Sequence, residues 1–207
     1  ERSCYGSFRS CIRKSNTRIE TMEIEKTAIE GVFIVKPNVF SDNRGYFFES
    51  YNKVEFERLG IRADFVQDNE SCSSKGVVRG LHFQAPPFAQ AKLIRVVKGS
   101  VLDIAVDIRK GSPTYGKHVM VRLDDKQKNM FFIPEGFAHG FVTLEDNTIF
   151  SYKCTALYNK ESEGGLLWSD PNLNIDWQIE SPILSDKDLV WEDFESFVTP
   201  FDYDKCL

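Results

Sequence analysis

Short runs of apolar residues, separated by turn signals, make up most of the chain from Met22 onward. In residues 101–109 aliphatic side chains occupy every second position, with Asp103 and Asp107 on the other face. A period of two residues is typical of a β-strand. Further β-like runs, bounded by Gly, Pro, Asn or Asp, cover residues 31–35, 46–51, 65–67, 76–84, 92–98, 118–123, 130–133, 141–144 and 148–155. Many short strands without intervening helices predict an antiparallel sandwich or barrel rather than a doubly wound α/β fold.

Helical patterns are few. Residues 52–60 begin with an Asn cap and end at a Gly, and a short amphipathic helix is expected to open at Ser185 and reach Phe194. A chain of 207 residues suits one domain, expected over residues 22–207 with a mixed segment from about residue 170. Residues 1–21 carry five basic residues against two acidic ones and few apolar side chains, so we expect a disordered leader or an extension added for expression.

Composition narrows the classes of function. The chain has 17 Phe but 3 Met, which suits a β-rich interior. A net charge of −5 without a basic stripe argues against a nucleic-acid partner. The apolar runs are too short for a membrane-spanning helix, so no membrane partner is expected. Five scattered Cys without a C-x-x-C pair favour a reducing, cytoplasmic location.

Two of the three histidines lie in compact segments that contain glycine. A regular strand would place Arg79 and His82 on opposite faces, but a bulge at Gly80 would bring both to one side. On this fragment alone, His82 is equally well interpreted as a general base or as a structural donor to a backbone carbonyl. His139 follows a Pro-Gly corner, where a ligand could approach, although an incidental rim position explains it too. His118 is expected at the surface.

A metal site is not expected, because the sequence has no H-x-H pair and no Cys/His cluster. Tyr152 shares the apolar face of its strand with Phe150 and Cys154, so it is either a packed core residue or a general acid pointing into a cavity.

The remaining candidates are charged. Asp188 lies three residues after Ser185, and helix capping alone accounts for it. Arg44, Arg79 and Lys92 are either solvated surface residues or contacts to a phosphate or an enolate oxygen. Neither glycine-rich phosphate loop, G-x-x-x-x-G-K-[ST] or G-x-G-x-x-G, is present.

Taken in order, eight segments resemble the dTDP-4-dehydrorhamnose 3,5-epimerase family. The similarity spans roughly Met22 to Asp188, and an ordered set at the right spacing is far more specific than any single fragment. The segments are residues 40–50, 65–69, 78–84, 92–95, 106–109, 134–141, 152–155 and 184–188. One departure is Leu157 before Tyr158, where relatives often have an aromatic residue, and it puts a stacking contact to the nucleotide base in doubt.

The resemblance implies an all-β, cupin-type jelly-roll barrel with a few short helices. It implies a homodimer in which N-terminal strands cross to the partner, no cofactor, and a dTDP-4-keto-6-deoxy sugar as substrate. His82 resembles the catalytic base, Asp188 its orienting carboxylate and Tyr152 the proton donor, and Lys92 is the candidate for stabilising charge on the C4 oxygen. The other substrate-contacting positions it implies are Arg44, Glu49, Gln67, Asn69, Arg79, His139, Glu163 and Lys187.

The function expected from the resemblance is inversion at C3 and C5 of dTDP-4-dehydro-6-deoxy-D-glucose, in dTDP-L-rhamnose biosynthesis. A ketone at C4 acidifies both carbons, and an imidazole with an ordinary pKa of about 6.5 suits proton removal near neutral pH. The alternatives are a relative that inverts one centre, a nucleotide-sugar ketoisomerase, and a sugar-binding jelly roll without catalysis. A metal-dependent cupin oxygenase would need ligands that this sequence lacks.

Overall fold

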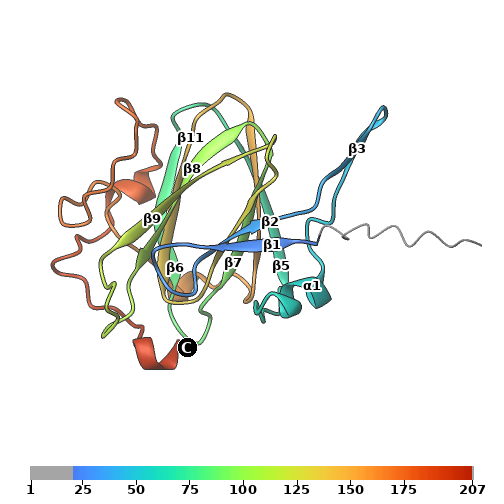
Figure 1. Ribbon diagram of the computed structural model, residues 1–207. Coiled ribbons are helices and arrows are strands. Elements are labelled where there is room, and N and C mark those ends of the chain that lie inside the picture. The colour runs from blue at the N-terminus through green and yellow to red at the C-terminus, as the bar shows by residue number, and fades with distance from the viewer. Residues whose placement is uncertain (1–20, 207) are drawn as a thin grey trace, which may run out of the picture.

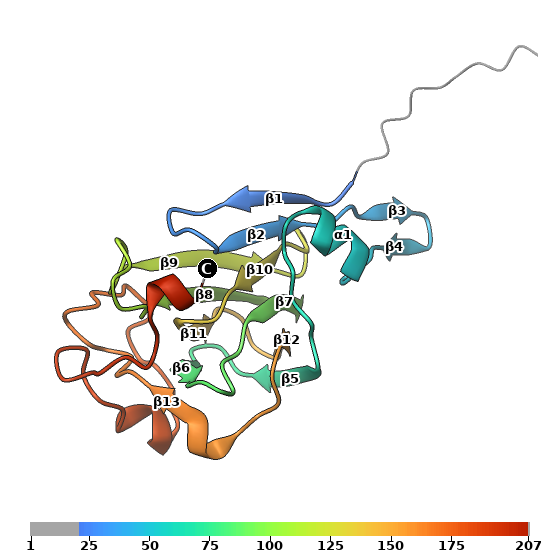
Figure 2. The same cartoon turned by 90° about the horizontal axis from the view of Figure 1, so that it is seen from below.

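Two antiparallel β-sheets stacked face to face form the body of the protein, seen in a computed structural model that describes residues 21–206 (Figures 1 and 2). The predicted leader at residues 1–21 therefore lies almost wholly outside the described residues and stays a prediction. The six-stranded sheet contains, in spatial order, β1 (Glu23–Lys26), β2 (Phe33–Lys36), β10 (Met130–Ile133), β7 (Lys92–Lys98), β12 (Thr148–Cys154) and β5 (Gln67–Ser73). The five-stranded sheet contains β13 (Glu163–Gly165), β6 (Val78–Gln84), β11 (Phe137–Thr143), β8 (Ser100–Asp107) and β9 (His118–Asp124).

Smaller elements attach to this body. Strands β3 (Phe40–Asp42) and β4 (Gly45–Phe47) form a hairpin that projects away from the sheets (Figure 1). Helix α1 (Lys53–Arg58) is capped by the Asn52 side chain, as the sequence predicts. Three 3-10 turns follow, η1 (Lys160–Ser162), η2 (Asp186–Leu189) and η3 (Tyr203–Lys205). Among residues 21–206, no helix is long and apolar enough to cross a membrane. The predicted all-β jelly roll is confirmed, and its short strands pair in antiparallel sheets.

Three apolar layers bury the two faces of each sheet. Between the sheets, Ile94 and Phe150 of one meet Ala105 and Phe141 of the other. Behind the six-stranded sheet, Phe56 of α1 packs with strand residues.

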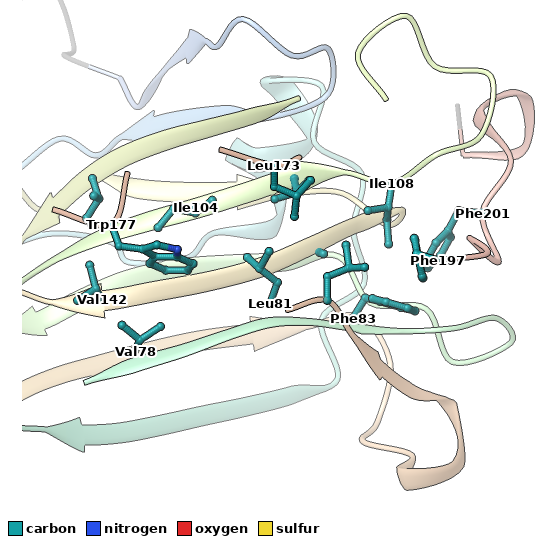
Figure 3. Packing of buried hydrophobic residues seen from close by; sticks show 14 of the residues in the cluster. Val78, Leu81, Phe83, Ile104, Ile108, Val142, Leu173, Trp177, Phe197 and Phe201 are labelled. Atoms are coloured by element: carbon teal, nitrogen blue, oxygen red, sulfur yellow. The ribbon is translucent and has the colours of Figure 1, made fainter. Parts of the chain in front are cut away.

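The C-terminal segment covers the outer face of the five-stranded sheet and is orange to red in Figure 1. Its Leu173, Trp177 and Phe201 pack over sheet residues such as Leu81 and Val142 (Figure 3). Burial of such apolar area supplies most of the driving force for folding.

Strand β8 is buried on both faces, because it lies inside a sheet with a packed layer on each side. Leu102, Ile104 and Val106 face the C-terminal segment and belong to its apolar layer. The face with Val101 and Ala105 looks into the space between the sheets, and Asp103 alternates onto it. The alternation was predicted, but its direction was not: the acidic residues face inward.

Two predicted boundaries were wrong. Strand β11 begins at Phe137 rather than at residue 141, so His139 lies within a paired strand and not at a corner. The amphipathic helix expected from Ser185 to Phe194 is only the turn η2. It stops because the next residues bond elsewhere: the N–H of Leu167 donates to the carbonyl of Glu192 at 2.8 Å, and that of Phe194 to Asp170 at 2.6 Å.

A buried ion pair anchors the end of β8. Arg109 is 2% exposed, and its Nε and Nη2 donate to the carboxylate of Asp107 at 2.9 and 2.7 Å. Burial acts to raise the pKa of Asp107, but hydrogen bonds from Arg109, Ser112 and Thr114 outweigh it and hold that pKa below its usual range. Asp42 and Arg44 form the same kind of pair, two residues apart, on the exposed hairpin.

We expect Asp107→Asn to lower the free energy of unfolding by about 3–5 kcal/mol, because it leaves the Arg109 charge buried without a counter-ion. Urea denaturation followed by circular dichroism measures the change. Asp64→Asn, which removes the exposed ion pair between Asp64 and Lys53, is the control and should leave the midpoint almost unchanged, since water solvates both partners there. Equal shifts for the two variants would contradict this account of the buried pair.

Candidate active site

A cavity of about 400 Å³ opens between the two sheets and receives side chains from both of them. His82 on β6 and His139 on β11 come from the five-stranded sheet, and Lys92 on β7 and Tyr152 on β12 from the six-stranded one. The full lining is Asn69, Glu70, Ser71, Arg79, His82, Lys92, His139, Phe141, Phe150, Tyr152, Ser185, Lys187 and Asp188. The sandwich therefore brings an imidazole and a phenol into one cavity from opposite walls.

His82 and Asp188 form the first hydrogen-bonded pair of this cavity. The Nε2 of His82 donates to Oδ1 of Asp188 at 2.5 Å, and the Ser185 hydroxyl donates to Oδ2 at 3.0 Å. The Asp188 side chain is 4% exposed. Its burial acts to raise the pKa of Asp188, but the interactions with His82, Ser185 and Lys187 together outweigh burial, and the pKa lies below its usual range. Asp188 is therefore ionised at neutral pH, and Nδ1 is the ring nitrogen of His82 left for other partners. Ser185 does cap η2, so capping and pairing with His82 both apply.

His139 and Asp103 form a second, deeper pair. Nε2 of His139 donates to Oδ1 of Asp103 at 2.8 Å, and the Asp103 side chain is wholly buried. Burial lowers the pKa of His139, with the nearby Lys92 charge acting in the same direction, so this imidazole is neutral at pH 7. Burial also raises the pKa of Asp103. Among the described residues, Oδ2 of Asp103 has no hydrogen-bond partner.

Lys92 and Tyr152 stand on the opposite wall, close to Cys154, which pairs with Lys92 across the strands. Lys92 is half-buried on this wall, and desolvation of its ammonium group lowers its pKa. Burial likewise raises the pKa of Tyr152, so the phenol keeps its proton well into the alkaline range. This wall therefore provides a proton donor, the Tyr152 phenol, and a cation, the Lys92 ammonium, which loses its proton at a lower pH than an ordinary lysine does.

A bulge in β6 aims two side chains into the cavity, and this prediction is confirmed. His139 pairs with His82, and Phe141 pairs with Arg79. Between these two pairs β6 therefore contains one residue more than β11, which is a β-bulge. Gly80 has φ +139°, and a Cβ there would lie 2.5 Å from the Cα of Gly140. Only glycine permits this close approach of the two strands.

The other predicted substrate-contacting residues fall into two groups. Asn69, Arg79, His139 and Lys187 line the cavity. Gln67 and Glu163 reach it indirectly, because Gln67 donates to Asn69 at 2.9 Å and Lys187 forms an ion pair with Glu163.

Arg44 and Glu49 are not among the residues that line this cavity. The Arg44 side chain is 85% exposed on the projecting hairpin, where it pairs with Asp42. Glu49 accepts hydrogen bonds from Asn52 beside α1. Nothing in the chain that the structure describes brings these two residues together with His82.

Sequence reasoning missed Asp103 as a site residue. Its signal was an acidic side chain in the middle of an aliphatic strand, which is costly unless it is paired. The described residues contain no group of three or more His, Cys, Asp or Glu that could hold a metal ion. The arrangement does suit proton transfer at a carbon acid: a carboxylate-paired imidazole faces a phenol, with an ammonium group to stabilise negative charge.

Comparison with known proteins gives consistent results. The dTDP-4-dehydrorhamnose 3,5-epimerase family profile matches residues 26–196. A dTDP-4-dehydrorhamnose 3,5-epimerase of Shigella flexneri is 52% identical over 174 residues, which cover 84% of this chain and 96% of that protein.

Solved structures agree with the sequence matches. The dTDP-4-dehydrorhamnose 3,5-epimerase of Elizabethkingia anophelis has a TM-score of 0.81 at 48% identity, covering 84% of this chain and 97% of that one. The dTDP-6-deoxy-D-glucose-3,5-epimerase of Legionella pneumophila, in complex with dTDP-4-keto-L-rhamnose, has a TM-score of 0.82 at 45% identity, covering 86% and 95%.

We expect the Lys92 ammonium to titrate below the ordinary lysine value of about 10.4, because burial disfavours its charged form. NMR of the side-chain ¹⁵N nuclei as pH is raised measures this, with Lys92→Met assigning the signal. Lys36 is an internal control in the opposite direction, since its bond to Glu25 raises its pKa. A Lys92 titration at or above the Lys36 value would contradict the burial of its charge.

Proposed function

This chain belongs to the dTDP-4-dehydrorhamnose 3,5-epimerase family, and we propose that four side chains of its cavity perform the family's reaction. The chain inverts C3 and C5 of dTDP-4-dehydro-6-deoxy-D-glucose to give dTDP-4-dehydro-L-rhamnose, in dTDP-L-rhamnose biosynthesis. The four side chains are those of His82, Asp188, Tyr152 and Lys92. The observation that carries their assignment is the position of His82 and Tyr152 on opposite walls of one cavity.

His82 is the base. It removes the proton from C3 or C5, and the electron pair of the broken C–H bond moves into an enolate on the C4 oxygen. Asp188 stabilises the resulting imidazolium and fixes the ring's tautomer, the role a carboxylate has beside histidine in hydrolase triads. A positioned proton-transfer group of this kind contributes about 10²–10⁴-fold to the rate.

Tyr152 is the acid on the other face. Its phenol donates a proton to the carbon opposite the face that lost one, and the ketone re-forms as the electrons return from oxygen. The raised pKa of Tyr152 supports this role, because the group remains protonated until the substrate carbanion needs a proton. The imidazolium then releases its proton to water, and the phenolate regains one, so that protons balance at each inverted centre.

Lys92 stabilises the negative charge on the C4 oxygen. A preorganised contact to such an oxyanion is typically worth about 2.7–4 kcal/mol of barrier. The buried position of Lys92 supports the assignment, because electrostatic contacts are stronger where water is excluded.

The nucleotide part of the substrate carries two negative phosphates, and the charges around the cavity suit it. Arg79 and Lys187 carry positive charges on the cavity lining. Neutral His139 and the Asn69 amide add uncharged hydrogen-bonding groups there. Gln67 and Glu163 hold Asn69 and Lys187 in place from the rim. We assign these six residues to substrate binding.

Arg44 and Glu49 require a second subunit. We infer a homodimer in which the N-terminal strands cross to the partner, so that the β3–β4 hairpin of each subunit completes the other's cavity. The hairpin supports this, because Phe40, Tyr46 and Phe47 are each more than half exposed on it. No bound cofactor enters any step of this mechanism, and a cytoplasmic location stays a prediction from the cysteine spacing.

In deuterated buffer, the wild type should introduce deuterium at both C3 and C5 of dTDP-4-keto-6-deoxyglucose, measured by NMR. His82→Asn should reduce exchange at both carbons by about 100-fold or more, because it removes the proposed base, and the other imidazole on that wall, His139, is more deeply buried and bonded to Asp103. Tyr152→Phe should impair inversion more than exchange, since His82 still removes and returns protons on its own face.

Tyr115→Phe is the matched control, because this phenol lies outside the cavity and packs against Phe194. It should leave both readouts unchanged. Exchange at one carbon only would indicate a single-centre epimerase. Equal loss of exchange and inversion in Tyr152→Phe would remove Tyr152 from the acid role.

Co-expression of Arg44→Ala with His82→Asn should restore activity that each variant lacks alone. One site of the mixed dimer then combines an intact His82 with the intact Arg44 of the other subunit. Co-expression of His82→Asn with Tyr152→Phe is the control and should restore nothing, because both residues belong to one subunit's cavity. Absence of complementation in the first pair would refute a shared site.

A further inference from the structure

Trp191, outside the proposed catalytic set, lies beside the His82 ring. The two ring centroids are 6.1 Å apart with an interplanar angle of 67°, an edge-to-face arrangement. Gly165 of β13 is the cross-strand neighbour of His82. A Cβ on Gly165 would lie 2.5 Å from two carbons of the indole, so the indole rests directly on this glycine. The indole thus occupies the space next to the imidazole, on the side of β13.

The backbone around Trp191 is fixed to the same sheet. The N–H of Leu167 donates to the carbonyl of Glu192 at 2.8 Å, and Leu166 and Glu192 form a parallel bridge. Three residues before Trp191, Asp188 accepts the hydrogen bond from His82. A single short segment therefore contacts the imidazole twice, once through a carboxylate at Nε2 and once through an aromatic ring at its flank.

The indole N–H of Trp191 makes no hydrogen bond among the described residues, so the role of the side chain lies elsewhere. Its nitrogen, Nε1, is buried. A buried donor without a partner is unfavourable, and Phe would avoid this cost while keeping a ring. What the indole provides here is its shape and its face, which also lies 5.6 Å from the Lys187 ammonium.

We propose that Trp191 is a positioning residue for the base. This inference rests on the proposed function. The indole blocks rotation of the His82 imidazole away from Asp188. The ring is then held with Nε2 on the carboxylate and Nδ1 available to the substrate. Small displacements of a proton-transfer group cost rate rather than affinity, because they matter most in the transition state.

The test compares Trp191→Ala, Trp191→Leu and Trp191→Phe by steady-state kinetics and by deuterium incorporation at C3 and C5. Trp191→Ala should lower kcat about tenfold through misplacement of the base. Its KM should stay within about twofold of wild type, because substrate contacts remain. Trp191→Phe should recover most of the rate, since it restores an aromatic ring beside His82. Trp191→Leu keeps apolar volume without a ring and should resemble Ala.

Trp168→Ala is the matched control: it removes another half-buried indole of the C-terminal segment, which packs on Trp177 and not on the cavity. It should leave kcat unchanged. Unchanged kcat in Trp191→Ala, equal losses in Trp191→Phe and Trp191→Ala, or the same loss in Trp168→Ala would each overturn the positioning role.

Should Trp191→Ala fail to fold, the comparison of Phe with Leu decides the question alone. The proposed function fails separately, if the wild type itself shows no deuterium incorporation.

Discussion

Burial of charge between and behind two β-sheets is the constraint on which the rest of this structure depends. An ionised group inside a sandwich is unfavourable unless a partner compensates it. Among the described residues, three buried acids are found with a basic side chain or a hydroxyl, and a fourth, Asp170, accepts hydrogen bonds from backbone N–H groups. Asp107 holds Arg109 with the help of Ser112 and Thr114, and this pair has a structural role. Asp188 and Asp103 each hold a histidine, and these pairs face the cavity.

The two histidine pairs differ in a way that suits different tasks. Asp188 comes from the 3-10 turn η2, and the His82 side chain it holds is 28% exposed. Asp103 comes from a central strand and holds His139 at 8% exposure. A ring that must accept and release protons needs a path to solvent. A ring that must stay neutral is better buried, because desolvation disfavours its charged form.

The C-terminal segment both covers the five-stranded sheet and supplies residues next to His82. It covers the outer face of the five-stranded sheet with Trp177 and Phe201, which closes the apolar layer there. On its way it delivers Asp188 and Trp191 to the same imidazole. Because one segment does both, the orientation of His82 depends on the packing of residues more than a hundred positions later in the chain.

Local patterns in the sequence determined the strands, the Asn52 cap and the bulge at Gly80, because each depends on side chains a few residues apart. The ordered motifs determined the family for the same reason. Only the tertiary structure decided that Asp103 faces inward, that η2 ends at Leu189 and that Arg44 lies outside its own cavity. Alternation places Asp103 on one face of its strand but cannot say which layer covers that face. The length of η2 and the place of Arg44 depend on contacts with distant segments, which no local window of sequence contains.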